Sequence, residues 1–342
     1  MERIANTPMK ILLVRLSSFG DVVFTLPLAK ALKSMGPGAA LAWAIEDPLA
    51  PLVEAAPYVD AVLLAQTRRW RRAPFSRDTR ADAARFLAEA RAFAPDVVVD
   101  AQGLWKSAWA TFLVPAARKV GFGPRTATER VNCLATDERV EAHGRAHAVD
   151  RALALAEHLS GRAGFERVPD VSHLVAREDP EVDAWLAARG PRPFALLQPF
   201  SSHPGKEWPG ASVVAVSRRL LGSSLPCAVR WGPGERERAA ALCASSGGAL
   251  ELAPPAGPAG SARLAARSAL FVGADTGPTH LAAAAGGATL ALFGPTDPER
   301  FGPVGPRSAV LRDPAATYNP SGASVGALSS DEIAEKALSL LA

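Results

Sequence analysis

The chain has 342 residues and a net charge of +4, and 48% of its residues are hydrophobic, 21% charged and only 6% aromatic. This composition excludes a disordered chain, a collagen and a small disulfide-built scaffold, and the length predicts two compact domains. The three cysteines, Cys133, Cys227 and Cys243, have no CxxC spacing. We therefore expect reduced thiols and no cysteine-held metal.

Short apolar runs alternate with helical stretches along the first half of the chain. The pattern predicts strands at residues 11–16, 41–45, 61–64 and 97–99, with helices at 21–32 and 81–93 between them. Apart from Arg15 these runs are apolar throughout, which is typical of parallel strands that are covered on both faces. A further helix is predicted at 146–159. The first half therefore forms a doubly wound α/β domain.

The same alternation restarts after a helix predicted at 180–188 and a Pro/Gly linker at 189–193. Strands are expected at 194–197, 227–231, 269–272 and 289–293, helices at 211–221, 235–244 and 276–285, and a terminal helix at 331–341. We expect a first Rossmann-like domain at 1–178, a second at 179–328, and a C-terminal helix within 329–342 that returns to the first domain. The two domains are expected to face a central cleft, with ligands at the carboxyl ends of the strands.

The longest stretch without a charged residue, 276–296, is as long as a membrane span. Glycines and prolines such as Gly277, Pro278, Gly286 and Pro295 divide it into helix, turn and strand. We therefore expect a cytoplasmic protein without a transmembrane segment. A sequence pI of about 9.2 still allows a membrane surface or an anionic ligand as a partner.

The first predicted strand leads directly into Ser17-Ser18-Phe19-Gly20-Asp21. This is not the G-x-G-x-x-G dinucleotide fingerprint, which disfavours a simple NAD enzyme. Gly20 permits a tight turn, and the N–H groups that open the next helix can hold an anion. The Asp21 carboxylate is placed at the mouth of the cleft, where it acts either as a catalytic group or as a helix cap.

A second polar segment, 100–107, follows the strand at 97–99 and places Gln102 and Lys106 at the carboxyl end of that strand. The alternative is a capped turn with a solvated lysine. A third segment, 68–80, holds six arginines and one acid, which gives it a local charge of +5. Such a cluster indicates a polyanionic ligand. Nucleic acid is disfavoured because no recognition motif is present, whereas a solvated basic loop remains an alternative.

The second half has polar segments at the corresponding positions. Ser201, Ser202 and Lys206 follow the strand at 194–197 and can bind a diphosphate through hydroxyls and charge. Glu235 opens a helix, where it either accepts from ribose hydroxyls or complements the helix dipole. The strongest local pattern, 273–280, follows a strand and opens a helix, and its polar candidates are Asp275, Thr276, Gly277 and His280. The alternatives for these side chains are a solvated loop and a packed core histidine.

Several catalytic motifs are absent from the sequence. It contains no D-x-D, H-E-x-x-H, P-loop or G-x-S-x-G pattern. We therefore expect no resident metal or cofactor, and an elbow serine hydrolase is disfavoured.

Five segments in this order resemble glycosyltransferase family 9, the bacterial lipopolysaccharide heptosyltransferases, over nearly the whole chain. They are 17–21, 68–72, 100–107, 206–209 and 275–280. The resemblance implies a GT-B fold, with the acceptor on the first domain and ADP-heptose on the second. The Arg-Arg-Trp-Arg block and Asp-Ala-Gln-Gly favour the branch of the family that makes the first heptosyl transfer.

By this resemblance the enzyme moves L-glycero-D-manno-heptose from ADP-heptose to the Kdo of Kdo-lipid A at the cytoplasmic face of the inner membrane. The resemblance implies Asp21 as general base. It assigns the donor to Ser201, Ser202, Lys206, Glu235, Asp275, Thr276, Gly277 and His280. It assigns the acceptor to Ser17, Ser18, Gly20, Arg68, Arg71, Arg72, Gln102 and Lys106. The alternatives are transfer to another core acceptor, a non-catalytic sugar-nucleotide-binding relative and, more weakly, a sugar-nucleotide epimerase.

Overall fold

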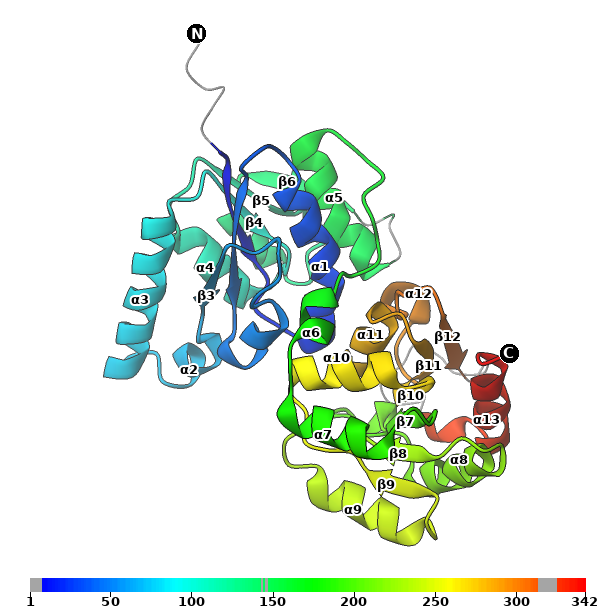
Figure 1. Ribbon diagram of the computed structural model, residues 1–342. Helices are drawn as coiled ribbons and strands as arrows, with labels where there is room; N and C mark the ends of the chain where they lie inside the picture. The colour runs from blue at the N-terminus through cyan, green and yellow to red at the C-terminus, as the bar shows by residue number, and fades with distance from the viewer. Residues whose placement is uncertain (1–7, 143, 145–146, 313–324) are drawn as a thin grey trace. The chain divides into compact units, whose positions relative to one another are not determined.

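The computed structural model describes residues 8–142, 144, 147–312 and 325–342. The chain divides into two compact units, Met1–Arg167 (unit 1) and Val168–Ala342 (unit 2), each built as an α/β domain (Figure 1). Within the described residues, no helix combines the length and the hydropathy that are needed to cross a bilayer.

Unit 1 is a parallel six-stranded sheet with helices on its faces. The strand order is β3-β2-β1-β4-β5-β6. The strands are β1 (Lys10–Val14), β2 (Ala40–Ile45), β3 (Ala61–Leu64), β4 (Val97–Asp100), β5 (Arg118–Phe122) and β6 (Glu138–Val140). The helices are α1 (Phe19–Lys33), α2 (Thr67–Arg72), α3 (Arg77–Phe93), α4 (Trp105–Leu113) and α5 (Ala148–Ser160). The predicted start of α5 at Ala146 lies outside the described residues.

Unit 2 repeats this topology with the order β12-β11-β10-β7-β8-β9, again parallel throughout. Its strands are β7 (Ala195–Gln198), β8 (Cys227–Val229), β9 (Leu250–Leu252), β10 (Leu270–Ala274), β11 (Ala288–Phe293) and β12 (Ser308–Arg312). Its helices are α6 (Ser172–Ala176), α7 (Pro180–Arg189), α8 (Gly210–Gly222), α9 (Arg236–Ser245), α10 (Pro258–Arg267), α11 (Gly277–Ala284), α12 (Pro298–Phe301) and α13 (Ser330–Ser339). Both sheets therefore have the Rossmann strand order, and the expected doubly wound fold is confirmed.

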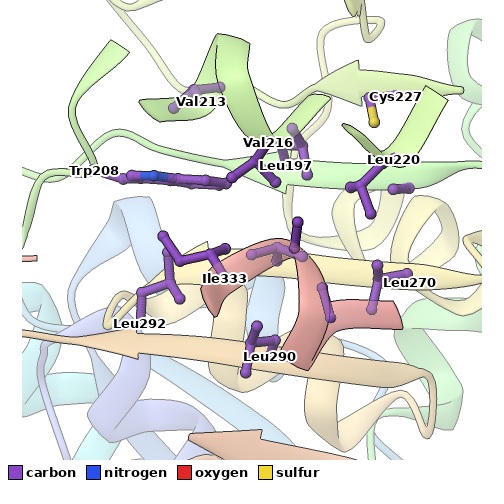
Figure 2. Packing of buried hydrophobic residues seen from close by; sticks show 14 of the residues in the cluster. Leu197, Trp208, Val213, Val216, Leu220, Cys227, Leu270, Leu290, Leu292 and Ile333 are labelled. Atoms are coloured by element: carbon purple, nitrogen blue, oxygen red, sulfur yellow. The ribbon is translucent and has the colours of Figure 1, made fainter. Parts of the chain in front are cut away.

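The C-terminal helix belongs to unit 2, so the expectation that it returns to the first domain was wrong. Helix α13 packs against α8 and buries Ile333, Ala334 and Ala337 in the core of unit 2. Figure 2 shows Ile333 among Trp208, Leu290 and Leu292. The apolar face of the helix is readable from its sequence, but the surface that covers this face is set by tertiary packing.

The boundary between the units falls earlier than the predicted one at 178. Helix α6 packs against α10, and α7 buries Val182 in a core cluster with Phe194 and Leu264. The Pro/Gly stretch after Arg189 joins α7 to β7 inside unit 2. The Arg189 guanidinium lies 4.7 Å from the ring centroid of Trp185 and 4.7 Å from that of Phe194. The burial of apolar side chains, rather than the position of the Pro/Gly stretch, therefore decides to which unit α6 and α7 belong.

Candidate active site

Each sheet has one topological switch point, where the chain winds in opposite directions from two adjacent central strands. These strands are β1 and β4 in unit 1, and β7 and β10 in unit 2. Open α/β sheets bind ligands just beyond the carboxyl ends of such strands. The predicted candidates follow these four strands, with the exception of Arg68, Arg71 and Arg72 after β3 and Glu235 after β8.

In unit 1 the Asp21 carboxylate is held in place by two neighbours in the turn that precedes α1. It accepts hydrogen bonds from the Ser18 backbone N–H at 3.2 Å and the Ser18 hydroxyl at 2.8 Å. The Arg15 guanidinium lies 2.8 Å from its other oxygen, and the Asp21 side chain stays 31% exposed. Asp21 therefore combines the capping role with access to solvent, so the two interpretations of this residue are compatible.

The ionisation of Asp21 reflects opposing effects. Burial acts to raise the pKa of its carboxyl, but the Arg15 charge and the hydrogen bonds from Ser18 lower it below its usual value. Asp21 is therefore ionised at neutral pH, which is the state that a general base requires. Arg15 was not predicted as a site residue, although it is the lone charge in an apolar strand and the sequence thus carried a signal for it.

Gln102 fixes the two central strands of unit 1 to each other. Its buried amide accepts from the Leu16 N–H at 2.9 Å and donates to the Ser17 carbonyl at 3.2 Å. Arg15 reinforces the same junction by donating to the Ala101 carbonyl at 2.6 Å. Because both ends of the Gln102 amide are bonded to backbone, this geometry supports a positioning role for Gln102.

A carboxylate that the sequence analysis missed organises the basic side chains. Glu46 follows β2 and its side chain is only 4% exposed. It accepts from the Thr67 hydroxyl at 2.5 Å, and Arg68 Nε and Lys106 Nζ lie 3.0 and 3.6 Å from its oxygens. Lys106 also donates to the Ser17 hydroxyl. Through Lys106, Glu46 thereby joins α2 and α4 to the turn that precedes α1, the helix that carries Asp21. An acid directly after an apolar strand was the available signal.

Lys106 is a partly buried cation. Burial lowers the pKa of its ammonium group, and the nearby Arg68 and Arg15 charges lower it further. The Glu46 charge acts in the opposite direction, but the pKa of Lys106 remains below its usual value. Lys106 is thus not the fully solvated lysine of the alternative interpretation.

A pocket of about 470 Å³ lies beside this network within unit 1. Its lining includes Arg68, Arg71, Arg80, Lys106 and three tryptophans, Trp70, Trp105 and Trp109. The basic segment is thus divided, because Arg69 pairs with Asp82 at 2.8 Å and Arg72 is exposed at the end of α2, outside the lining. Arg68, Arg71 and Lys106, three of the predicted acceptor residues, share one cavity that suits an anion with an apolar portion.

In unit 2 the loop after β7 meets the loop after β10 through a buried ion pair. Lys206 Nζ lies 2.6 Å from one oxygen of Asp275, which also accepts from the Thr296 hydroxyl at 2.5 Å. His280 Nε2 lies 3.1 Å from the other oxygen. The Asp275 side chain is 3% exposed. Burial acts to raise the pKa of this carboxyl, but His280 and Lys206 hold it far below its usual range.

The start of α11 lies against this ion pair. Thr276 is the N-cap residue and Gly277 the first residue of the helix. Gly273 in β10 is required by close packing, because a Cβ there would lie 2.5 Å from the Thr279 hydroxyl. The N–H groups that open α11 and the Lys206 ammonium together form an electropositive corner that suits phosphate oxygens.

The remaining donor candidates lie at the same edge of the sheet. Ser201 and Ser202 share the loop that carries Lys206, and Ser202 is exposed. Glu235 precedes α9 and accepts from the Gly232 N–H at 2.6 Å, so that its carboxylate closes its own turn. Arg230 after β8 was missed. Its buried guanidinium donates to Gln198 at 2.7 Å, and burial, partly opposed by Glu235, lowers its pKa to about 10.

Comparisons with known proteins show which family and fold the chain resembles. The family model described as glycosyltransferase family 9 (heptosyltransferase) matches residues 84–321. The lipopolysaccharide heptosyltransferase 1 of Pseudomonas aeruginosa PAO1 is 32% identical over 299 residues, which are 87% of this chain and 82% of that protein. The structure of Escherichia coli heptosyltransferase WaaC with ADP is 28% identical and has a TM-score of 0.82, covering 97% of this chain and 100% of its own. WaaC with ADP-2-deoxy-2-fluoro heptose is 28% identical and has a TM-score of 0.78, covering 96% and 98%.

Proposed function

Because the chain belongs to glycosyltransferase family 9, we propose that it transfers L-glycero-D-manno-heptose from ADP-heptose to the Kdo residue of Kdo-lipid A. The observation that carries this proposal is the Asp21 carboxylate, which is ionised, half-buried and fixed at the switch point of unit 1. The name of the Pseudomonas aeruginosa relative, heptosyltransferase 1, supports the first heptosyl transfer over a later one.

The reaction is a single displacement. A Kdo hydroxyl oxygen bonds to the anomeric carbon of heptose while Asp21 takes the proton of that hydroxyl. The bond from the anomeric carbon to the diphosphate oxygen breaks, and ADP leaves with the electron pair. Attack opposite to the leaving group inverts the configuration at that carbon. The Arg15 charge and the Ser18 hydrogen bonds keep the Asp21 carboxyl ionised, as a base must be, and fix its orientation.

Unit 2 is proposed to hold the donor. Lys206 and the N–H groups at Thr276 and Gly277 would stabilise the charge that develops on the departing ADP. Asp275 holds Lys206 and His280 in place for this role. In the same proposal the hydroxyls of Ser201 and Ser202 contact the diphosphate. Glu235 would accept hydrogen bonds from the ribose hydroxyls through the carboxylate lone pairs that the Gly232 N–H does not occupy.

Unit 1 is proposed to hold the acceptor. Kdo-lipid A carries carboxylate and phosphate groups, which match the guanidinium groups of Arg68, Arg71 and Arg72 and the Lys106 ammonium. Ser17 and Ser18 lie in the turn that precedes α1, and Gly20 lies beside Asp21 in the first turn of that helix, where the attacking sugar would lie. Because the acceptor is a lipid, we infer that the enzyme works at the cytoplasmic face of the inner membrane.

Product analysis tests the proposal. Purified protein is incubated with ADP-heptose and Kdo-lipid A, and the lipid is examined by mass spectrometry for the gain of one heptose. Transfer only to an already heptosylated core would assign the chain to a later step. Donor binding without turnover on any acceptor would indicate a non-catalytic relative. Consumption of ADP-heptose without an acceptor would point to an epimerase or a hydrolase.

A further inference from the structure

Helix α4 has the reverse of the pattern expected for a surface helix. Its exposed positions are the aromatic residues Trp105, Trp109 and Phe112, whereas Ser107 and Thr111 are buried. The buried hydroxyls donate to the Leu104 carbonyl at 2.8 Å and the Asp100 carboxylate at 3.1 Å. The three aromatic residues are spaced i, i+4 and i+7, so they share one face of α4. A helix in water normally exposes charged or polar side chains, whereas α4 exposes this apolar stripe.

The neighbouring segments extend this stripe. Helix α4, labelled in Figure 1, packs against the 3₁₀ turn Arg130–Ala135, which exposes Val131 and Leu134. Within the described residues most large exposed hydrophobic side chains belong to unit 1, namely Phe75, Trp105, Trp109, Phe112, Val131 and Leu134. We call these six residues the apolar rim. Scattered exposed leucines are ordinary, but a concentration of this kind marks an interaction surface.

The apolar rim borders the basic pocket. Trp105 and Trp109 line that pocket together with Pro74, the residue before Phe75. The Trp109 ring lies 5.2 Å from that of Trp70 in α2, and Lys119 Nζ lies 5.7 Å from the centroid of the Phe112 ring. Tryptophan beside lysine and arginine is the composition that settles at the boundary between lipid headgroups and acyl chains.

The surrounding charge favours an anionic partner. Segment 68–80 carries +5, and three of its arginines face the pocket beside the rim. Glu46 and Asp82 pair with Arg68 and Arg69 and offset part of this charge, whereas Arg71, Arg80 and Lys106 also line the pocket. In a two-fold symmetric dimer through this face, a second copy of the chain would bring its own arginine cluster close to this one, which like-charge repulsion opposes.

We propose that the apolar rim is a membrane-docking surface that inserts into the interface of an anionic lipid bilayer and holds the basic pocket at headgroup level. This deepens the proposed function, since a lipid acceptor would then reach the pocket without leaving the bilayer. Lipid binding by the rim requires neither the donor nor the acceptor, so it is measured independently of transfer.

The test is cosedimentation with vesicles of phosphatidylethanolamine and phosphatidylglycerol at 3:1. The variant is Phe112→Ser/Leu134→Ser, whose side chains are 66% and 79% exposed and lie outside the pocket lining. The matched control is Leu221→Ser/Leu341→Ser in unit 2, with side chains 43% and 37% exposed. We expect the rim variant to lower vesicle partitioning at least about tenfold, and the control to bind like wild type.

Three outcomes would overturn the proposal: no binding of the wild type to these vesicles, equal binding by both variants, or lipid-free dimers that only the rim variant abolishes. The last result would assign the rim to a second copy of the chain. Transfer to a water-soluble acceptor without acyl chains should be equal in wild type and rim variant. If neither protein transferred heptose to this acceptor, the proposed function would be rejected, but the conclusion from the vesicle experiment would still stand.

Discussion

Replacing Lys206 by alanine removes the ammonium group that pairs with the buried Asp275 carboxylate in the proposed donor site. In the wild type its ammonium lies 2.6 Å from Asp275, whose side chain is 3% exposed, while Lys206 itself is 23% exposed. A charge-assisted hydrogen bond to a diphosphate oxygen contributes about 1.5–3 kcal/mol. Its loss should therefore weaken ADP-heptose binding by roughly 10- to 150-fold.

The same substitution leaves the Asp275 carboxylate with His280 and Thr296 as its remaining partners. Removing one member of a fully buried ion pair costs about 3–5 kcal/mol. Because two donors remain and Lys206 is partly exposed, we expect the unfolding free energy of unit 2 to fall by about 1–3 kcal/mol. Adding Asp275→Asn should recover part of this stability but none of the donor affinity.

Isothermal titration calorimetry with ADP-heptose at fixed ionic strength measures the first effect, and urea unfolding measures the second. Arg219→Ala is the control, because it breaks an ion pair with Asp331 in the same unit whose side chains are 47% and 65% exposed. Such pairs contribute little, so donor binding should stay within about twofold. Wild-type donor affinity in the Lys206→Ala protein would refute the diphosphate role of Lys206.

Three further predictions follow from the geometry. Since the pKa of Asp21 is lowered, kcat/KM should persist as pH falls through neutrality and decline only below the pH at which an ordinary aspartate protonates. Arg15→Gln should move this decline to higher pH, and an unmoved acid limb would contradict the pairing. Ile333→Ala should destabilise unit 2 by about 3 kcal/mol in urea unfolding, because the side chain is fully buried; an unchanged midpoint would place α13 elsewhere. Arg68→Gln/Arg71→Gln should raise the acceptor KM about 3- to 10-fold with donor affinity unchanged, and a matching loss of donor affinity would argue against an acceptor pocket.

The central strands could be predicted from the sequence because both of their faces are buried. Residues 11–14 are entirely buried, and they form an unbroken apolar run. Strands β5 and β6 gave no such signal, whereas the edge strand β3 was predicted at 61–64. Strand β5 begins with Arg118 and Lys119, and β6 contains Glu138 and Arg139, because each lies toward the edge of the sheet and is partly solvated. No helix was predicted for α4, whose exposed face is aromatic rather than charged.

Candidate site residues could be proposed from the sequence where a polar segment comes after a predicted strand. Asp275 directly follows β10, whereas Asp21 lies in the first turn of α1, after the loop that follows β1, and Lys206 lies in the loop that follows β7. Their partners were less visible, because ion pairs join residues that are far apart in the chain. Lys106 pairs with Glu46, and Lys206 lies 69 positions before Asp275. Spacing within a single segment carries no signal for such contacts, which the strand order of the sheet creates.

The most direct test of the account is transfer by the Asp21→Asn enzyme, measured as heptosylated product from ADP-heptose and Kdo-lipid A. Asparagine keeps the size of the side chain and an acceptor oxygen for Ser18, but it cannot take up the proton of the attacking hydroxyl. We predict that kcat falls about 10²- to 10⁴-fold while ADP-heptose binds with unchanged affinity. Wild-type turnover by this variant would contradict the assignment of Asp21 as the base.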